Sequence, residues 1–396
     1  MISRYLLFII IGIDALILFS QTTFLSISYE EASLFYGEFS PLKLLVEFSV
    51  SLFGHNDLGL RFVMILFHIL SVVLLYFISL EYVNTQRNRL WLLLLFVLLP
   101  GVISSAVMVN SAGMIMFGLL LYVYLHNRVS QNFLLPLLLF YALIDIGFAY
   151  LFLGLLFFSI HKKDYKLSLY YIGLYLLVTF IYGSDVDGYP SGHFLDTVGV
   201  YSAIFTPIIF IYIFYVLYRR LLTKRVDLLW FIASTGLTFS LLLSFRQSVP
   251  IAHFAPYLIV ALPLAAQTFS HSYRIRLKEH RKFYRGVFLV AFSFLLLNAL
   301  AVLFNKELYL VTQNPQKHFV YNLHIAKELS NTLKSMDIPC VTTEQKMQLR
   351  LNFYGIKKCS DYLLTELDKS SNVKENVTIG YKNVTLYRAS VTKVNK

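Results

Sequence analysis

Long apolar runs separated by short polar segments fill this chain up to about residue 304. A helix needs roughly 20 apolar residues to cross the hydrocarbon core of a bilayer. The pattern predicts about eleven such helices, and therefore an all-α polytopic membrane protein. The predicted spans are residues 5–24, 59–80, 90–107, 111–125, 132–148, 149–160, 167–183, 199–218, 226–245, 254–269 and 286–304.

The two shortest runs, 132–148 and 149–160, are interpreted as an up-and-down pair of helices. Joining them into one segment would reverse the orientation of every later span. The basic loops that follow argue against such a reversal, because Lys and Arg concentrate in alternate loops throughout the chain. This distribution predicts a cytoplasmic N-terminus and an external C-terminus. The strongest basic group is Arg274, Arg276, Lys278, Arg281, Lys282 and Arg285.

Composition supports the membrane assignment and excludes a purely soluble fold. Hydrophobic residues make up 57% of the chain and charged residues only 14%, whereas soluble domains average about 25% charged residues. The formal net charge is +12. Because the basic residues follow the positive-inside pattern, we interpret this charge as a topological signal and expect no nucleic-acid partner.

The composition becomes typical of a soluble domain from about residue 305. We therefore expect a transmembrane domain at residues 1–304 and a small external α/β domain at residues 305–396. An amphipathic segment at 42–53, in the first external loop, is expected to lie along the membrane interface. The elements predicted in the external domain are a helix at 319–336, a strand at 339–343 and a hairpin of 377–381 with 384–388.

Two cysteines, Cys340 and Cys359, lie in the predicted external domain. In an oxidising compartment they would form one disulfide, and the alternative is two buried free thiols. Their spacing alone does not choose between these states.

Candidate catalytic residues gather in segments that the topology places on the external side. Glu30 and Glu31 follow the first span, and Arg61 begins the second. Arg246 and His253 flank the turn before the tenth span. A carboxylate suits removal of a proton from an acceptor group, and arginine suits stabilisation of a phosphate leaving group.

Each of these residues also has a structural interpretation. The two glutamates are alternatively solvated loop charges, and Arg61 is alternatively a side chain that snorkels to the headgroups. Arg246 and His253 are alternatively helix caps or contacts for anionic lipid. Asp14 and Asp145, within apolar segments, are interpreted as structural hydrogen-bonding partners, and Asp145 is alternatively a residue that orients a substrate. A further group has residue types that bind metals, but its spacing matches no known pattern, so we predict no metal and no cofactor; it contains Asp185, Asp187, His193 and Asp196.

Two stretches resemble one family. The sequence Glu30-Glu31-Ala32, followed by an interfacial segment and by Phe53-Gly54 and Leu58-Gly59-Leu60-Arg61, resembles the C-type (GT-C) membrane glycosyltransferases related to protein O-mannosyltransferases and to lipid A aminoarabinose transferase. The stretch Pro250 to Leu258 looks like the penultimate external turn of the same family. The likeness in layout covers roughly residues 5–270.

The resemblance implies an enzyme of the bacterial inner membrane. It would be an inverting glycosyltransferase that moves a sugar from a polyprenyl-phosphate donor, within the membrane lipids, to a glycolipid, glycan or protein acceptor in the periplasm. Glu30 stands at the position of the family's catalytic aspartate and Glu31 at its acidic neighbour, so either is the expected general base. Arg61, Arg246 and His253 would bind the donor phosphate.

The chain departs from the family pattern at two places. Glu30 replaces the leading aspartate, which moves the carboxylate by about one methylene. The second acidic motif of the family is replaced by Val109-Asn110-Ser111-Ala112, where only Asn110 is suited to orient a substrate by hydrogen bonding.

Two other functions fit the same pattern of spans. A transporter or flippase for lipid-linked glycans would carry charges near the middle of the membrane and inverted repeats. A non-catalytic membrane scaffold would use its external domain to bind a partner. The sequence has few central charges and no evident repeat, which favours the transferase.

Overall fold

The computed structural model describes residues 2–183, 190–312, 314–367 and 377–393, and the chain divides into two compact units. Unit 1 comprises Met1–Leu16 and Met64–Ala299, and unit 2 comprises Ile17–Val63 and Leu300–Lys396. The predicted boundary at residue 304 lies close to one observed boundary. The sequence did not reveal that residues 17–63 belong with the C-terminal segment.

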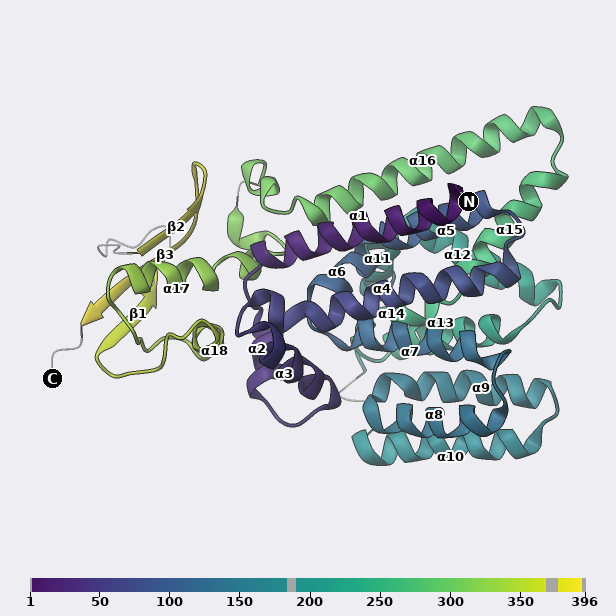
Figure 1. Ribbon diagram of the computed structural model, residues 1–396, viewed down its shortest axis with the longest axis horizontal. Coiled ribbons are helices and arrows are strands. Elements are labelled where there is room, and N and C mark those ends of the chain that lie inside the picture. Colours follow the sequence, from purple (N-terminus) through teal and green to yellow (C-terminus); the bar gives the residue numbers. More distant parts are fainter. Residues whose placement is uncertain (1, 184–189, 313, 368–376, 394–396) are drawn as a thin grey trace. The chain divides into compact units, whose positions relative to one another are not determined.

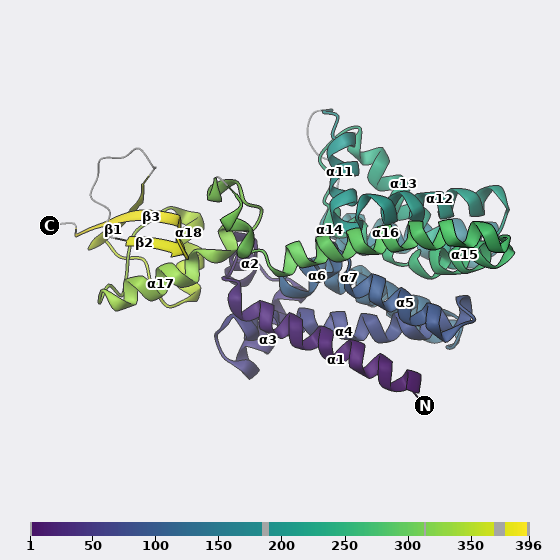
Figure 2. The ribbon, with the colours of Figure 1, turned by 90° about the horizontal axis from the view of Figure 1, so that it is seen from above.

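Helices form all the regular structure in the described part of unit 1 (Figures 1 and 2). In chain order they are the first part of α1 (Ile2–Phe24), most of α4 (Asp57–Tyr82), α5 (Gln86–Val97), α6 (Pro100–Val107), α7 (Ser111–His126), α8 (Gln131–Ile144), the short 3-10 helix η1 (Ile146–Phe148), α9 (Ala149–His161), α10 (Tyr165–Tyr182), α11 (Phe194–Phe205), α12 (Pro207–Leu222), α13 (Leu228–Ser244), α14 (Ile251–Ile259), α15 (Leu262–Ile275) and most of α16 (Lys278–Leu303).

The core of unit 1 lies where α9, α13 and α14 pack together. Helix α9 packs against α10 and α13, and α14 packs against α7 and α13; α8, α9 and α10 form a group in Figure 1. Large aromatic side chains such as Phe152 and Tyr257 are fully buried there. Gly236 allows α13 and α14 to approach closely, because a Cβ atom at this position would lie 2.4 Å from the Cβ atom of Tyr257.

Five helical segments have the length and apolar character needed to cross a membrane. They are Tyr5–Phe24, Asp57–Tyr82, Tyr165–Tyr182, Ile251–Ile275 and Lys278–Leu303. Two bent helix pairs raise the number to seven if each pair is one span. The chain is thus compatible with a multi-pass membrane protein. The predicted number of eleven spans stays a prediction, because the remaining predicted spans coincide with shorter apolar helices of 10–17 residues.

The two bent pairs are interrupted at prolines. Helices α5 and α6 meet at 60° before Pro100, and α11 and α12 meet at 105° before Pro207. Proline lacks an N–H donor and disfavours helical geometry in the preceding residue. Thr206 has φ 63°, outside the helical region. The predicted continuous spans 90–107 and 199–218 are therefore each broken into two helices.

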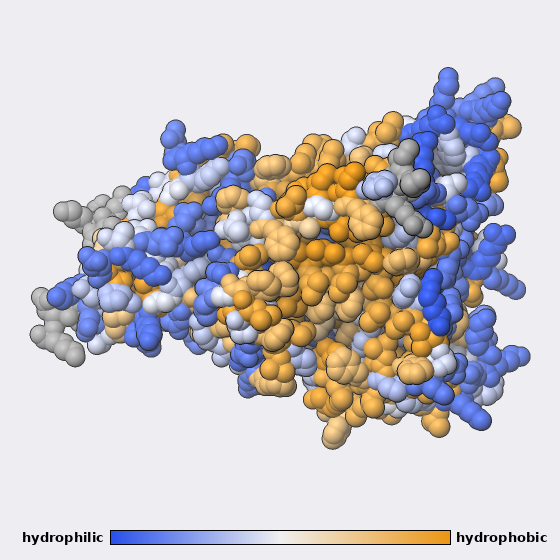
Figure 3. Space-filling model, viewed as in Figure 1, coloured by the Kyte–Doolittle hydropathy of each residue, from blue (hydrophilic) through white to orange (hydrophobic). Residues whose placement is uncertain are grey.

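The surface of unit 1 combines a wide apolar face with a hydrophilic end. Figure 3 shows hydrophobic residues covering much of the face in view, with hydrophilic residues gathered where α15 joins α16. Exposed hydrophobic side chains on α10 include Leu169 and Phe180. An apolar exterior of this kind suits contact with lipid chains.

Unit 2 contains the first interhelical loop and the C-terminal segment. Its loop helices are α2 (Tyr29–Tyr36) and α3 (Pro41–Phe53). Helix α3 begins at a Ser40 cap with proline in its first turn. Its exposed side includes Phe48 and Leu52, whereas Val46 is buried. The predicted helix in this loop is confirmed, and its exposed apolar side fits the expected interfacial position.

The C-terminal segment of unit 2 folds as a small α/β structure, as expected. Three antiparallel strands pair in the order β1 (Tyr362–Glu366), β3 (Val384–Lys393) and β2 (Val377–Tyr381). The predicted hairpin is confirmed, and β3 is longer than expected. The predicted strand at 339–343 was wrong, because this stretch makes only isolated bridges, at Cys340 and Thr342. The elements are η2 (Glu307–Leu310), η3 (Pro315–Lys317), η4 (Tyr321–His324), α17 (Ala326–Ser335), α18 (Gln345–Phe353), β1 (Tyr362–Glu366), β2 (Val377–Tyr381) and β3 (Val384–Lys393).

The predicted helix at 319–336 is shorter in the structure. Regular α-helix begins only at Ala326, and the preceding residues form η4. The core of this segment is formed by apolar residues of α17 and the sheet, including Leu329, Leu333 and Ile379.

Candidate functional site

The acidic pair of the first loop occupies the first turn of α2, and its two members have different surroundings. Ser28 caps this helix by accepting a hydrogen bond from the backbone N–H of Glu31 (3.0 Å). The Glu31 carboxylate in turn accepts from the backbone N–H of Ser28 (2.9 Å). This reciprocal capping box fixes the start of α2 and the rotamer of Glu31.

Glu31 also forms a buried ion pair with Arg61. Arg61 donates from Nε to Oε1 at 2.9 Å and from Nη2 to Oε2 at 2.7 Å. Both side chains are 0% exposed. A two-point arginine–carboxylate contact in a buried setting is strong and strongly oriented.

The remaining donors of Arg61 bind the chain just after α1. They reach the carbonyl oxygens of Thr22 (3.3 Å), Leu25 (2.7 Å) and Ser26 (2.9 Å). All five N–H groups of the guanidinium therefore have partners. The predicted phosphate contact of Arg61 does not fit this geometry, because a phosphate would have to displace a carbonyl group or Glu31 from a buried site. Arg61 instead holds the end of α1, α2 and the start of α4 together.

Glu30 differs from its neighbour because its side chain is exposed. Its carboxylate has no hydrogen bond or ion pair with any residue that the structure describes, whereas its backbone is fixed within α2. The sequence left Glu30 and Glu31 as equivalent candidates for the general base. Of the two carboxylates, only that of Glu30 is accessible to an acceptor in this arrangement.

The C-terminal segment holds the same loop through hydrogen bonds that the sequence did not predict. Ser26 donates from its backbone N–H and its hydroxyl to the carbonyl of Leu323 (2.7 and 2.8 Å). The backbone N–H of Ile27 donates to the Tyr354 hydroxyl (2.8 Å), and Arg350 Nε donates to the carbonyl of Ile27 (3.0 Å). The loop is therefore held from both sides, by Arg61 and by α18.

A second buried carboxylate strengthens this attachment. Asp57 is 4% exposed, accepts a hydrogen bond from the Tyr354 hydroxyl and forms an ion pair with Lys327 Nζ at 2.7 Å. Burial, followed by the nearby Asp57 charge, raises the pKa of Tyr354, so this hydroxyl remains a donor at neutral pH. A weak signal existed in the sequence, since Arg350 and Tyr354 are four residues apart and so share one side of a helical segment.

Helix α18 also brings cationic side chains to α2. Lys346 Nζ lies 5.7 Å from the centre of the Tyr29 ring, and Lys346 is exposed. Burial lowers the pKa of Arg350, and the charge of Glu30 is among the effects that oppose this shift. Sequence reasoning missed both cations because they lie about 320 positions away in the chain.

The other predicted phosphate ligands lie in unit 1. His253, on α14, approaches Asp145 with its Nε2 3.9 Å from Oδ1. Asp145 also accepts a hydrogen bond from the backbone N–H of Gly147 (2.7 Å), and Tyr257 donates to the carbonyl of the same glycine (2.6 Å). Asp145 therefore has the predicted structural role. Arg246 is exposed between α13 and α14.

The predicted convergence of Arg246 and His253 with the acidic loop of unit 2 stays a prediction. Asn110, the predicted substrate-orienting residue, caps α7 by accepting a long hydrogen bond from the backbone N–H of Gly113 (3.4 Å). Its amide also donates to the carbonyl of Met108 (3.3 Å). The observed contacts of Asn110 are thus those of a helix cap.

Asp14 has the structural partner that the sequence predicted. Its carboxylate lies 2.6 Å from Nε2 of His68, which connects α1 with α4 inside unit 1. The His68 ring also stacks on Phe96, with ring centres 5.8 Å apart. The pair gives this carboxylate a polar partner among apolar helices.

The possible metal-binding group is only partly within the described residues. Asp185 and Asp187 lie outside them. His193 makes hydrogen-bond contacts with Ser191 (2.9 Å) and Asp196 (3.1 Å) through its two ring nitrogens. These contacts use both nitrogens within the loop and do not indicate a metal site.

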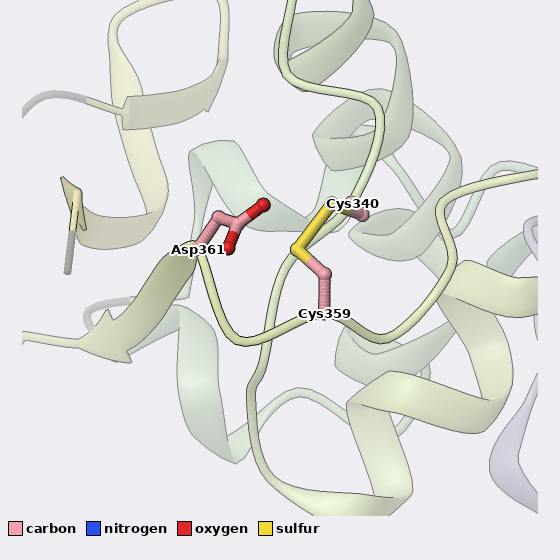
Figure 4. A group of neighbouring side chains, drawn as sticks. All are labelled: Cys340, Cys359 and Asp361. Atoms are coloured by element: carbon pink, nitrogen blue, oxygen red, sulfur yellow. A yellow bond between two sulfur atoms is a disulfide. The ribbon is translucent and has the colours of Figure 1, made fainter. Parts of the chain in front are cut away.

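Cys340 and Cys359 form a disulfide, with a Cα–Cα distance of 5.5 Å (Figure 4). Of the two states that the sequence allowed, the structure therefore has the disulfide and not the two free thiols. Asp361 lies beside the sulfur atoms. A metal would require thiolate ligands, so this group is not a metal site while the disulfide is intact.

Comparisons with known proteins give no family for this chain. No protein-family model matches it, and no curated protein shows significant similarity.

Proposed function

We propose that this chain is a GT-C-like glycosyltransferase of a bacterial inner membrane. It would transfer a sugar from a polyprenyl-phosphate donor to a glycolipid, glycan or protein acceptor at the periplasmic face. The N-terminus would be cytoplasmic and the C-terminal segment periplasmic. The observation that carries the proposal is the contrast within the acidic pair: Glu31 is locked by Ser28 and Arg61, and the adjacent Glu30 is exposed on the helix turn thus fixed.

In the proposed reaction Glu30 is the general base. Its carboxylate accepts the proton from the acceptor group as that group attacks the anomeric carbon of the sugar. The bond between this carbon and the donor phosphate breaks, and its electron pair leaves with polyprenyl phosphate. Attack opposite the leaving group inverts the anomeric configuration. A base of this kind typically contributes about 10²–10⁴-fold to the rate.

The leaving phosphate needs fixed positive charge. Arg246 and His253 remain the proposed ligands, and the exposed Lys346 beside α2 is a further candidate within unit 2. Arg61 is a positioning residue in this proposal, because its donors serve Glu31 and the backbone. Fixed cations stabilise a developing phosphate charge by charge-assisted hydrogen bonds.

The test follows release of polyprenyl phosphate by the purified full-length chain. The chain is incubated with polyprenyl-phosphate sugars and an envelope extract as the acceptor source, and the product is quantified by mass spectrometry. We expect Glu30→Gln to lower the rate by about 10²–10⁴-fold. Glu30→Asp should retain much of the activity, since it keeps a carboxylate. Glu38→Gln, at another exposed acid of the same loop, is the matched control and should be unaffected.

Two results would overturn the proposal. One is release at the wild-type rate by Glu30→Gln, and the other is no release by the wild-type chain with any donor tested.

A further inference from the structure

A cavity of about 450 Å³ lies in unit 1, where the C-terminal ends of α4, α12 and α15 meet. The positive-inside pattern predicts that all three of these helix ends are cytoplasmic. The volume falls within the usual range for small-molecule sites. The cavity is lined by Tyr82, Val83, Asn84, Arg219, Arg220, Thr223, Arg225, Gln267, Thr268, Ser270, His271 and Arg274.

The lining carries several positive charges and no carboxylate. Of its four arginines, Arg219 and Arg220 lie on α12 and Arg274 lies on α15, whereas Arg225 lies in the loop after α12. The one ion pair that the described residues show for these arginines joins Arg220 to Asp227, at 3.4 Å. Several like charges around one cavity repel one another, so an anion bound there would relieve this repulsion.

Most of these guanidinium groups keep donors for a ligand. Arg219 bonds to hydroxyl groups only, of which Ser272 is the nearer (3.2 Å). Arg225 and Arg274 are exposed, and their side chains have no hydrogen bond or ion pair with any described residue. Arg220 is the exception, since Asp227 and Gln267 fix it in the wall. The cavity thus combines one anchored arginine with three available ones.

Exposed apolar side chains also lie on α12, at positions adjacent in sequence to the lining arginines. Tyr218, Leu221 and Leu222, next to the lining arginines on α12, are 54%, 52% and 64% exposed. A phosphate in the cavity with acyl chains along such surface is the arrangement expected for a bound phospholipid. Basic pockets between membrane helices on the cytoplasmic side commonly take anionic headgroups.

We propose that this cavity binds a phosphate-bearing anion, with the headgroup of an anionic phospholipid as the favoured source. Arginine forks match phosphate oxygens in two-point contacts, and the hydroxyls of Thr268 and Ser270 supply further polar contacts. A soluble phosphate compound shares this chemistry and is distinguished by experiment. The lining shares no residue with the proposed donor site, and the test does not depend on transferase activity.

The test measures binding by the full-length chain in an uncharged detergent. Thermal unfolding is followed during titration with phosphatidylglycerol in mixed micelles, with phosphatidylcholine as the neutral reference and inorganic phosphate in a parallel series. The key variant combines Arg225→Gln with Arg274→Gln. The matched control combines Lys278→Gln with Lys282→Gln, which removes the same charge from exposed positions outside the cavity.

We expect saturable stabilisation by phosphatidylglycerol and none by phosphatidylcholine. The arginine variant should lose about tenfold or more in affinity, and the lysine control should keep the wild-type value. Replacing both arginines by lysine keeps the charge and should lose only part of the affinity, because lysine lacks the planar fork. Equal melting in phosphatidylcholine checks that the variants fold.

Inorganic phosphate identifies the source of the anion. Competition by phosphate at millimolar concentration, lost in the arginine variant, would indicate a soluble ligand, and absence of competition would indicate the lipid. The proposal is overturned if both double variants weaken lipid binding equally, since general surface charge would then explain it. It is also overturned if the wild-type chain responds neither to phosphatidylglycerol nor to phosphate.

Discussion

At the scale of single residues, the acidic pair shows how much the local sequence contained. Ser28 with Glu31 three residues later is the pattern of a capping box, so the N-terminal cap of α2 could be predicted from the sequence. The partner of Glu31 was not, because Arg61 lies 30 positions away and the resemblance favoured a phosphate contact for it. Sequence proximity made Glu30 and Glu31 look equivalent, whereas burial separates them.

Glu31→Gln should destabilise the protein much more than Glu30→Gln. The first change leaves the buried guanidinium of Arg61 without its counter-charge, which typically costs about 3–5 kcal/mol. The second change alters an exposed side chain, so the free energy of unfolding should stay within about 0.5 kcal/mol of the wild-type value. Thermal or denaturant unfolding of the two purified variants compares them directly. Equal stabilities would contradict the structural role assigned to the ion pair.

His324 should make unit 2 sensitive to acid. Burial, followed by the charges of Lys306 and His318, lowers the pKa of His324 to about 3, against about 6.5 for an unfolded chain. Between these two pKa values the imidazole binds a proton in the unfolded state but not in the folded state. The stability from neutral His324 is therefore present above about pH 6.5 and is lost as pH falls towards 3.

The melting temperature measured from pH 7 to pH 4 tests this expectation. His324→Asn removes the titrating group and places an amide near the position of Nδ1, which contacts the Tyr309 hydroxyl (3.0 Å) in the native protein. The melting temperature of the variant should fall less steeply with decreasing pH than that of the wild type. Identical declines would show that His324 is not the group responsible.

At the scale of elements, apolar runs located the helices well and their breaks poorly. Every predicted span coincides with a helix or a pair of helices, because burial or lipid contact requires apolar residues in either case. The sequence shows Pro100 and Pro207 as possible break points, but it does not give the angle between the two helices at each break. The prediction of a strand at 339–343 failed for a similar reason. The isolated bridges that this stretch makes depend on partners elsewhere in the chain, which the local sequence does not specify.

Thr206→Gly should stabilise the junction of α11 and α12. Thr206 is buried and has φ 63° and ψ 146°, a conformation that a β-branched residue rarely adopts. Removing this strain should outweigh the greater entropy of unfolded glycine and stabilise the chain by about 1 kcal/mol. Thr179→Gly, within α10, is the control and should destabilise it. A lower melting temperature for Thr206→Gly would contradict the strained backbone.

At the scale of the whole molecule, the two units are interleaved along the chain. Residues 17–63 and 300–396 form unit 2 although more than 200 residues separate them in sequence. Hydropathy and charge describe local segments, so they gave the span pattern but not this association. The hydrogen bonds of Ser26 and Ile27 with the C-terminal segment hold it together.

The number and direction of spans make a separate prediction. Eleven spans with a cytoplasmic N-terminus require an external C-terminus. A reporter active only outside the cytoplasm should therefore work when fused after Lys396, and the same reporter should be silent when inserted at Lys282 in the most basic loop. The opposite pattern would show that the number or orientation of spans is wrong.

The central claim is that Glu30 and a lipid phosphate share one site. An electron cryomicroscopy structure of the full-length chain with saturating polyprenyl phosphate measures this directly. We predict phosphate density within hydrogen-bonding distance, about 3 Å, of Arg246, His253 or Lys346, with the Glu30 carboxylate facing the same pocket. Phosphate bound far from all three residues, or no bound lipid while Glu30 faces bulk solvent, would contradict the account.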